Sequence, residues 1–238
     1  MEIIKNEKLY EGKVKIIYKT NEQNILWIEY KNSVTAFNGL KKDEIVGKAI
    51  LNNKISSLIF EKLNEKGIEN HFIKELSDTE QLVKKVKIIP LEVVIRNIVA
   101  GSMSVRLGIE EGTILENPII DFHYKNDELN DPLITLSHIK VLKILEDDQI
   151  KEIEKKSFKI NEVLKDIFDI AHITLVDFKL EFGLDEKGEI LLADEISPDT
   201  CRLWQVDTNE RLDKDVYRKN IGDLLTAYEK VYEKLKSK

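Results

Sequence analysis

The sequence predicts an α+β protein whose first third is rich in β-strands and whose remainder mixes strands with helices. The stretches KLYEGKVKIIYKT and NILWIEYKNSVT carry many β-branched and aromatic residues with turn residues between them, which is typical of hairpins. Two later segments, at 150–171 and 216–235, repeat apolar residues in steps of three and four, which is typical of helices. With 238 residues, 42% of them hydrophobic, the chain can bury a real core.

The amino-terminal part is expected to form a small antiparallel sheet and one helix. From Gly47 to Lys66 apolar residues recur at helical spacing, and Gly67 supplies a stop. Strand-like segments return at NHFIKEL, EQLVKKVKII and LEVVIRNIV, and the first two would join the earlier hairpins in the sheet. Pro90 stands where this unit would hand over to the rest of the chain, which predicts lobes of residues 1–89 and 90–238.

The second part is expected to begin with a short helix after Gly101, a strand around PIIDFHYK and a polar turn in NDELNDP. A helix follows, with a buried stripe that runs from Ile150 to Ala171. Residues 176–197 then read as two strands joined by DEKG, and the loop DEISPDTCRLW leaves them. A helix from Val216 to Leu235 closes the chain, with these residues on its buried side: Ile221, Leu224, Leu225, Tyr228, Val231 and Leu235.

Composition argues against several classes of protein. The net charge of -7 arises from 44 acidic and 37 basic residues without a basic block, so we expect no nucleic-acid partner. No apolar stretch approaches the roughly 20 residues that span a bilayer, and no signal peptide is evident, so we expect a soluble, cytoplasmic protein without a membrane partner. One cysteine and four separated histidines leave no multi-cysteine or HExxH metal site, and Cys201 is assigned a packing role.

A charged face is expected on the strand VDFKLEFG. Successive side chains of a strand point to opposite faces, so Asp177, Lys179 and Glu181 share one face. Leu175 and Leu192 are expected beside these charges, which favours a partly enclosed cleft over the common alternative, a solvated face with a cross-strand salt bridge. The apolar residues that share the other face and pack are Val176, Phe178, Leu180 and Phe182.

The loop DEKG decides which residue of the next strand faces these charges. If Asp185 pairs with Gly188, Lys179 lies opposite Asp194 and Glu181 is its diagonal neighbour, with side-chain bases about 5 to 8 Å apart. Carboxylates at that separation can share one divalent cation. The pattern therefore predicts a magnesium site at Glu181 and Asp194 beside a lysine.

Two basic clusters could bind anions. In LYEGKVKIIY, Gly12 permits a tight turn, and Lys13 and Lys15 then share one strand face that could hold phosphates; otherwise they are solubilising lysines of an edge strand. Neither a GxxxxGK[ST] nor a GxGxxG motif occurs. In VVIRNIVAGSMSVRLGI, Arg96 stands in an apolar strand and needs an anionic partner, with Ser102 as a second donor; an internal salt bridge is the alternative.

Seven motifs, in this order, closely resemble those of the SAICAR synthetase family: LYEGKVK, TAFNG, NNKISSLIF, RNIVAGSMSVRLGI, NDPLIT, LVDFKLEFG and DEISPDTCRLW. The resemblance covers nearly the whole chain. It implies a small amino-terminal β lobe similar to the small lobe of a protein kinase, a larger α+β lobe, an ATP cleft between them and assembly as a homodimer. The activity it implies is ATP-dependent joining of L-aspartate to carboxyaminoimidazole ribonucleotide in purine biosynthesis.

The resemblance also implies a role for individual residues. Lys179, Glu181 and Asp194 would form the catalytic centre, and the two carboxylates would bind Mg²⁺. Asp199 would shape its loop. ATP would be bound by Lys13, Lys15, Lys179 and the segment from Ile88 to Glu92. The residues that would bind or lie near the ribonucleotide are Arg96, Ser102, Lys125, Asp131, Asp177, Arg202 and Arg218.

The implied chemistry needs no protein nucleophile, because ATP would phosphorylate the imidazole carboxylate before the amine of aspartate attacks it. A small-molecule kinase on the same scaffold is the alternative, and a non-catalytic nucleotide-binding module is a third hypothesis. One departure from the family pattern is Gln205, which follows Trp204 where an aspartate is expected in many relatives.

Overall fold

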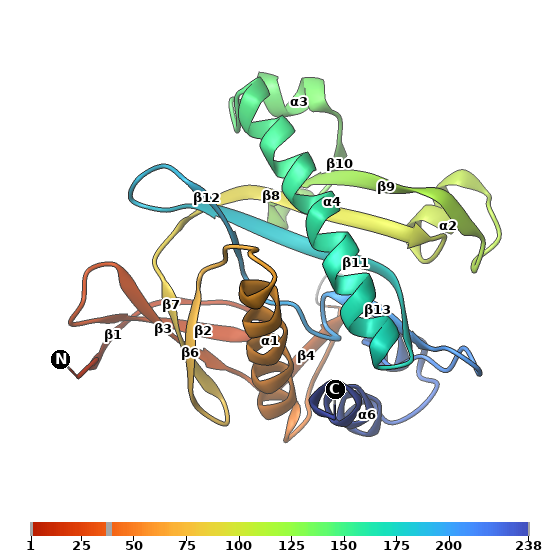
Figure 1. The fold of residues 1–238 in the computed structure, drawn as a ribbon, viewed down its shortest axis with the longest axis horizontal. Helices are drawn as coiled ribbons and strands as arrows, with labels where there is room; N and C mark the ends of the chain where they lie inside the picture. The colour runs from red at the N-terminus through yellow and green to blue at the C-terminus, as the bar shows by residue number, and fades with distance from the viewer. Residues whose placement is uncertain (1, 37–39, 238) are drawn as a thin grey trace.

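Two antiparallel sheets form the framework of the protein (Figure 1). The structure is a computed structural model that describes residues 2–36 and 40–237, so part of the motif TAFNG lies outside the described residues. The first sheet has the strand order β1-β2-β3-β7-β6, and the second has the order β10-β9-β8-β11-β12, with β13 paired to β11. This mixture of antiparallel sheets and helices is the α+β class that the sequence predicts.

The first sheet comprises β1 (Lys5–Glu11), β2 (Lys15–Thr20), β3 (Ile25–Tyr30), β6 (Phe72–Ser77) and β7 (Glu80–Lys84). A separate pair, β4 (Ser33–Ala36) and β5 (Lys41–Glu44), lies between β3 and the first helix in the chain, and its second strand was not expected. Helix α1 (Lys48–Glu65) comes next and ends before Gly67, whose φ of 72° suits a glycine, as the sequence predicts.

The second sheet comprises β8 (Lys87–Ile98), β9 (Ile114–Tyr124), β10 (Leu133–Ile134), β11 (Ile173–Leu184), β12 (Ile190–Ala193) and β13 (Cys201–Gln205). Its helices are α2 (Ser102–Leu107), the 3₁₀ turn η1 (Asp127–Leu129), α3 (Leu136–Val141), α4 (Asp147–Ile170), α5 (Asp215–Lys219) and α6 (Leu224–Lys236). Part of the expected loop DEISPDTCRLW is therefore strand β13. None of the helices in the described ranges is long and apolar enough to cross a membrane.

The chain changes sheet between β7 and β8. Lys84 ends the first sheet, whereas Lys87 already pairs with β11 in the second. Pro90 lies inside β8, where the β8–β11 register shifts. A proline has no N–H to donate, so within a sheet it is tolerated at such an irregularity, where the regular hydrogen-bond ladder is interrupted. The hand-over thus begins a few residues before the expected position, and the division into lobes of residues 1–89 and 90–238 stays a prediction.

One large core joins the second sheet to α1, α4 and α6. The stripe expected on α4 is confirmed, because Ile153 and Leu164 are fully buried and α4 packs against β11. The last predicted helix is wrong in one respect: Asn220, at a φ of 54°, ends α5, and Asp223 starts α6 by accepting a hydrogen bond from Thr226 N at 2.8 Å. Ile221 in this break is 57% exposed, not buried.

The alternation along β11 also differs from the expectation. A β-bulge between Leu175 and Asp177 resets the pattern, so Leu175 joins the large core while Val176 packs against Ala100 and Trp204. Leu192 lies in the large core too. The two leucines therefore do not stand beside the charged residues, and the prediction that they would is wrong.

Candidate active site

A cavity of about 810 Å³ lies between the two sheets, with walls from β2, β3 and β7 on one side and β8 and β11 on the other. It brings together residues from across the sequence, including every site residue inferred above. These are Lys13, Lys15, Ile88, Glu92, Arg96, Ser102, Lys125, Asp131, Asp177, Lys179, Glu181, Asp194, Arg202 and Arg218. Their common location follows from the structure, whereas their individual roles stay predictions.

One end of the cavity is apolar. Ile17, Leu26, Ile28 and Val83 line it from the first sheet, and Ile88 lines it from β8. Such a recess between two sheets suits a flat, largely apolar ring. A glycine in β11 helps to close this end, since a Cβ on Gly183 would lie 2.8 Å from Val86 Cβ.

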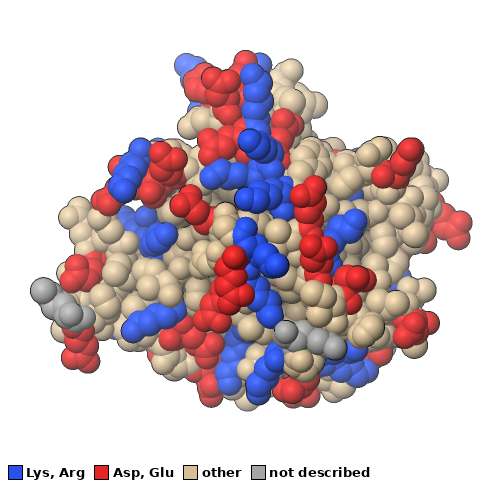
Figure 2. All heavy atoms as spheres, viewed as in Figure 1, with Lys and Arg blue, Asp and Glu red and all other residues tan. Residues whose placement is uncertain are grey.

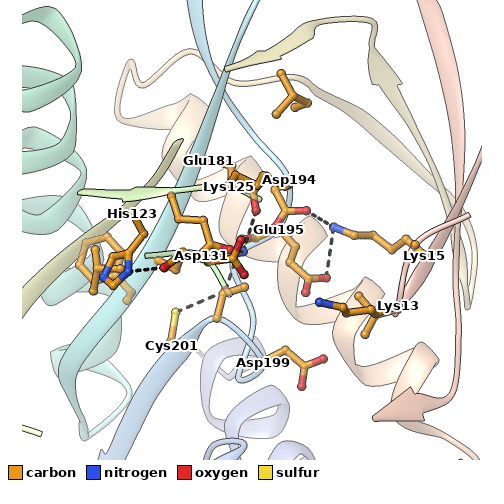
Figure 3. Close-up of a pocket in the computed structure, with 18 of the residues that line it drawn as sticks. Lys13, Lys15, His123, Lys125, Asp131, Glu181, Asp194, Glu195, Asp199 and Cys201 are labelled. Carbon is orange, nitrogen blue, oxygen red and sulfur yellow. Dashed lines mark hydrogen bonds and ion pairs between the residues drawn. The ribbon is translucent and has the colours of Figure 1, made fainter. Parts of the chain in front are cut away.

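The centre of the cavity holds alternating lysines and carboxylates (Figure 3). Lys15 Nζ lies 2.5 Å from Asp194 Oδ1 and 3.6 Å from Glu195 Oε2. Lys179 Nζ donates to Glu181 Oε1 at 2.6 Å and to Glu92 Oε1 at 2.9 Å. Positive and negative groups are therefore interleaved within one enclosed space.

Lys125 adds a further ammonium to this centre. It reaches Glu181 Oε2 from the other side of that carboxylate, so both oxygens of Glu181 accept from lysines. Lys13, by contrast, lies at the exposed mouth and pairs with Asp127 Oδ1 at 2.7 Å. The Lys13–Asp127 pair links the β1–β2 turn to η1 across the mouth of the cavity.

The hairpin register that was expected to join Glu181 and Asp194 is wrong by one residue. Glu181 pairs with Ala193, because Asp185 N bonds to Glu189 O and Gly188, at a φ of 82°, makes a longer loop than the expected two-residue turn.

Both carboxylates still line the cavity, and each forms an ion pair with a different lysine, Glu181 with Lys179 and Asp194 with Lys15. Asp194 follows β12 with a left-handed φ of 62°, which breaks the strand alternation. The charges of Glu181 and Asp194 both act on Lys179, and Figure 3 shows both side chains in the centre of the cavity.

Charge pairing decides the protonation of these buried groups. Burial would lower the Lys179 pKa, but the carboxylates of Glu181, Asp194 and Glu92 outweigh it and raise the pKa well above its usual range. Burial likewise would raise the Asp194 pKa, but Lys15 and Lys179 hold it below its usual range. Lys179 is thus charged and Asp194 ionised at neutral pH.

An arginine clamp forms the far end of the cavity. Asp177 Oδ2 accepts from Arg202 Nη1 at 2.7 Å and from Arg96 Nη1 at 3.0 Å. Arg96 also donates to Asp121 at 2.8 Å and lies 3.5 Å from Ser102 Oγ. The internal salt bridge considered as an alternative for Arg96 is therefore present, although the residue also lines the cavity.

A buried ion pair supports the floor of the cavity and was missed from the sequence. Lys48 is fully buried, and its Nζ lies 2.5 Å from Asp199 Oδ2. Asp199 also accepts from Asn52 at 2.9 Å and from the Tyr228 hydroxyl at 2.6 Å. Its carboxylate thus ties the 194–200 loop to α1 and α6. The segments that carry these groups are far apart in the sequence, which offered no signal for their contact.

Other cavity residues were missed too, among them His71, Glu195 and Lys214. Glu195 directly follows Asp194, so its position offered a signal; Lys214 stands in a polar segment without one. Burial lowers the His71 pKa to about 3, which leaves its ring neutral. Cys201 has the expected packing role, because it is buried in the large core and burial raises the pKa of its thiol.

The residues present fit a magnesium ion that a nucleotide brings with it. Among the described residues, no group of three or more His, Cys, Asp or Glu could hold a metal unaided. Mg²⁺ commonly takes one or two protein carboxylates and completes its shell with water and substrate phosphates. Glu181 and Asp194 offer that number of carboxylates, next to lysines that suit phosphate.

These features together define an enzyme cleft for phosphorylated substrates, with an apolar recess at one end, paired carboxylates at the centre and arginines at the other end. The model of the SAICAR synthetase family matches residues 8–235, and the chain belongs to that family. The resemblance drawn from the seven motifs is thereby confirmed.

Relatives and solved structures agree with this assignment. The chain is 62% identical over 235 residues to a phosphoribosylaminoimidazole-succinocarboxamide synthase of Bacillus subtilis, covering 99% of this chain and 98% of that protein. A crystal structure of the enzyme of this name from Ehrlichia chaffeensis has a TM-score of 0.95 and 51% identity, covering 97% and 98% of the two chains. A SAICAR synthetase in complex with ADP has a TM-score of 0.93 and 47% identity, covering 100% and 98%.

These matches confirm the predicted fold class and the prediction of an ATP-dependent ligase. They do not favour the small-molecule kinase that was the alternative.

Proposed function

We propose that this chain joins L-aspartate to carboxyaminoimidazole ribonucleotide, with ATP as the energy source, and releases SAICAR, ADP and phosphate. The observation that carries the proposal is the cavity itself, where Glu181 and Asp194 stand among lysines between an apolar recess and an arginine clamp. The family membership over residues 8–235 supports the same reaction.

ATP would occupy the end of the cavity beside the first sheet. Its adenine fits the apolar recess next to the segment from Ile88 to Glu92, and a relative of 47% identity is described as a complex with ADP. Lys15 and Lys179 would then face its phosphates, and Lys13 would join them by leaving Asp127 at the mouth.

The ribonucleotide would occupy the opposite end. Arg96, Arg202 and Arg218 supply planar donors for a phosphate, and Ser102 begins α2 beside them. Asp177 would accept from ribose hydroxyls while it holds two of the arginines in place. Lys125 and Asp131 line the same cavity and would lie near the imidazole carboxylate.

Glu181 and Asp194 would hold Mg²⁺, which neutralises charge on a transferring phosphoryl group when it is bound. Lys179 would hold the phosphoryl oxygens, because its own contacts to Glu92 and Glu181 fix the ammonium in the centre of the cavity. The enclosed walls would exclude water from the reacting groups.

The reaction follows from the chemistry of the substrates. A carboxylate is a poor acyl donor, so an oxygen of the imidazole carboxylate first takes the γ-phosphoryl group of ATP and ADP leaves. The aspartate amine then forms a bond to the carboxyl carbon, the bond from that carbon to the phosphate oxygen breaks, and phosphate leaves as the amine loses a proton. The protein aligns the reactants and offsets charge, and it needs no nucleophile of its own.

The proposal includes two properties that rest on the family resemblance. These are assembly as a homodimer and a cytoplasmic location, where the other enzymes of purine biosynthesis would supply the ribonucleotide. Size-exclusion chromatography with light scattering tests the first, and a dimer is expected at micromolar concentration.

The test is ADP release by the purified chain with ATP, Mg²⁺ and carboxyaminoimidazole ribonucleotide, with and without L-aspartate. We expect ADP and SAICAR in equal amounts, and SAICAR only when aspartate is present. Stoichiometric formation of a stable phosphorylated ribonucleotide without aspartate would instead identify a kinase. Nucleotide binding without turnover under every condition would identify a binding module.

A further inference from the structure

The residues assigned to ATP and the ribonucleotide leave the amino-acid substrate without a site. L-Aspartate carries two carboxylates and one ammonium, so its site needs a cation and an anion that are not already fully paired. Two cavity residues outside the roles above meet this description, Glu195 and Lys214.

Glu195 is a buried carboxylate with an incomplete set of partners. The residue is 3% exposed, and no described residue donates a hydrogen bond to its Oε2. Its nearest cation is Lys15, at 3.6 Å from that oxygen, but Lys15 is already bonded to Asp194 at 2.5 Å. Figure 3 shows Glu195 beside Asp194, extending toward the side chains of the first sheet. A buried acceptor in this state favours a ligand that donates to it.

Lys214 is the complementary cation. Its side chain is 11% exposed, and within the described ranges the nearest carboxylate oxygen is Asp199 Oδ1 at 4.0 Å, which is an ion-pair distance but too long for a hydrogen bond. Asp199 is itself occupied by Lys48, Asn52 and Tyr228. Burial lowers the Lys214 pKa, which an anionic ligand would reverse.

A backbone hydrogen bond links the segments that carry the two groups. Glu195 lies in the 194–200 segment that leaves β12, and Lys214 N donates to Pro198 O of the same segment at 3.0 Å. The Lys48–Asp199 ion pair anchors this loop to α1. Both side chains line the same cavity.

We propose that Glu195 and Lys214 form the binding site for L-aspartate, in which Glu195 accepts hydrogen bonds from its ammonium group and Lys214 binds a carboxylate. This inference rests on the proposed ligase function. Because Glu195 is adjacent to Asp194 in the chain, an amine bound there lies beside the carboxylate pair at which phosphoryl transfer would occur. The amine is then placed for attack on the activated ribonucleotide.

Isosteric variants test this site. Glu195→Gln and Lys214→Met are compared with Lys230→Met, which removes a lysine on α6 that is 43% exposed and pairs with Glu210. We expect the KM for L-aspartate to rise by about tenfold or more in the first two variants and to stay at the wild-type value in the third. The affinity for ADP with Mg²⁺, measured by calorimetry without aspartate, is expected to stay within about twofold in all three.

Succinate separates the two roles, because it keeps both carboxylates of aspartate and lacks the ammonium. As an inhibitor competing with aspartate, succinate should bind Glu195→Gln at least as well as the wild type, whereas Lys214→Met should bind both compounds more weakly. A purely structural role for Glu195 would weaken both compounds alike. Thermal unfolding identifies any misfolded variant, and Lys214→Arg, which keeps the charge, is then expected to retain succinate inhibition.

The outcomes separate this inference from the function on which it rests. If the wild type makes no product from aspartate, the proposed function is wrong. If the wild type is active and both variants keep the wild-type KM for aspartate and the wild-type inhibition by succinate, this assignment is wrong while the ligase function stands.

Discussion

Gly101 lies directly against the guanidinium of Arg202, and a Cβ placed on Gly101 would stand 2.7 Å from Arg202 Cζ. The glycine also has a φ of 54° and a ψ of -129°, a combination that other residues rarely adopt. Arg202 cannot easily move away, because it donates to Asp177 at 2.7 Å and to Asp215 at 3.0 Å. The turn before α2 therefore requires glycine for two separate reasons.

Gly101→Ala should impair the arginine clamp. We expect the new methyl group to displace the Arg202 guanidinium and to raise the KM for the ribonucleotide by about tenfold or more, with a loss of about 1–3 kcal/mol in the free energy of unfolding. Steady-state kinetics and urea denaturation measure these effects. Gly112→Ala is the matched control, since Gly112 has a φ of 98° but nothing lies within 4 Å of its added Cβ. That variant should lose stability and keep its KM; equal KM changes in both variants would exclude the clash.

Glu181→Gln and Asp194→Asn should remove the response of nucleotide binding to magnesium. Each variant replaces an anionic ligand by a neutral amide, which Mg²⁺ binds weakly. We expect turnover to fall by about a hundredfold or more, and ADP affinity to become nearly independent of Mg²⁺ in calorimetry. Glu186→Gln, on the hairpin loop and bonded to Asn24, is the control and should behave as the wild type. A wild-type increase of ADP affinity with Mg²⁺ in both site variants would contradict the metal assignment.

The contents of the site could be foreseen from the sequence because charges in apolar strands are rare and have few explanations. Asp177, Lys179 and Glu181 stand out in this way, and they do line one cavity. The family resemblance then supplied residues with no local signal, such as Lys125 and Arg218, which lie outside the seven motifs. Charged residues on the surface do not identify the site in the same way. Figure 2 shows Lys and Arg in a band with Asp and Glu on either side of it.

The geometry could not be foreseen, for reasons that are physical. The hairpin register depends on one loop residue, Gly188, and the direction of Asp194 depends on a left-handed φ that no periodicity predicts. Lys48 and Asp199 are 151 positions apart, so their pairing is a property of the tertiary fold alone. The break at Asn220 was hidden because the apolar spacing continues across it.

The buried Lys48–Asp199 pair should show strong energetic coupling. Lys48→Met leaves the Asp199 carboxylate without its nearest counter-ion, so we expect a loss of about 3–5 kcal/mol in the free energy of unfolding, and a similar loss for Asp199→Asn. The double variant should be less destabilised than the sum, with a coupling of about 1–3 kcal/mol by urea denaturation. The more exposed pair Lys54–Asp78, at 2.8 Å between α1 and the β6–β7 turn, should couple by less than about 1 kcal/mol. Additive effects at Lys48 and Asp199 would show that the contact contributes nothing specific.

Asp213 should make stability depend on pH near neutrality. Burial, followed by the charge of Asp215, raises its pKa to about 7. In the unfolded chain the pKa of an aspartate is about 4. At pH values between about 4 and about 7, Asp213 is therefore protonated in the folded state and ionised in the unfolded chain. The contribution of Asp213 to stability is therefore complete below about pH 4 and is lost as the pH rises through about 7.

The measurement is urea denaturation of the wild type and Asp213→Asn from pH 5 to pH 8. The variant has no titrating carboxyl at this position, so the free energy of unfolding of the wild type should fall relative to it by about 1.4 kcal/mol per pH unit from about pH 5 to about pH 6.5, and then level off. His71, whose pKa burial lowers to about 3, is present in both proteins, so its own effect cancels from the difference. Parallel curves for the two proteins would mean that Asp213 does not titrate in this range. A difference of the opposite sign would mean that its carboxylate is stabilised in the folded state, as two backbone donors, Leu203 N at 2.8 Å and Asp215 N at 2.7 Å, would favour if they outweighed burial.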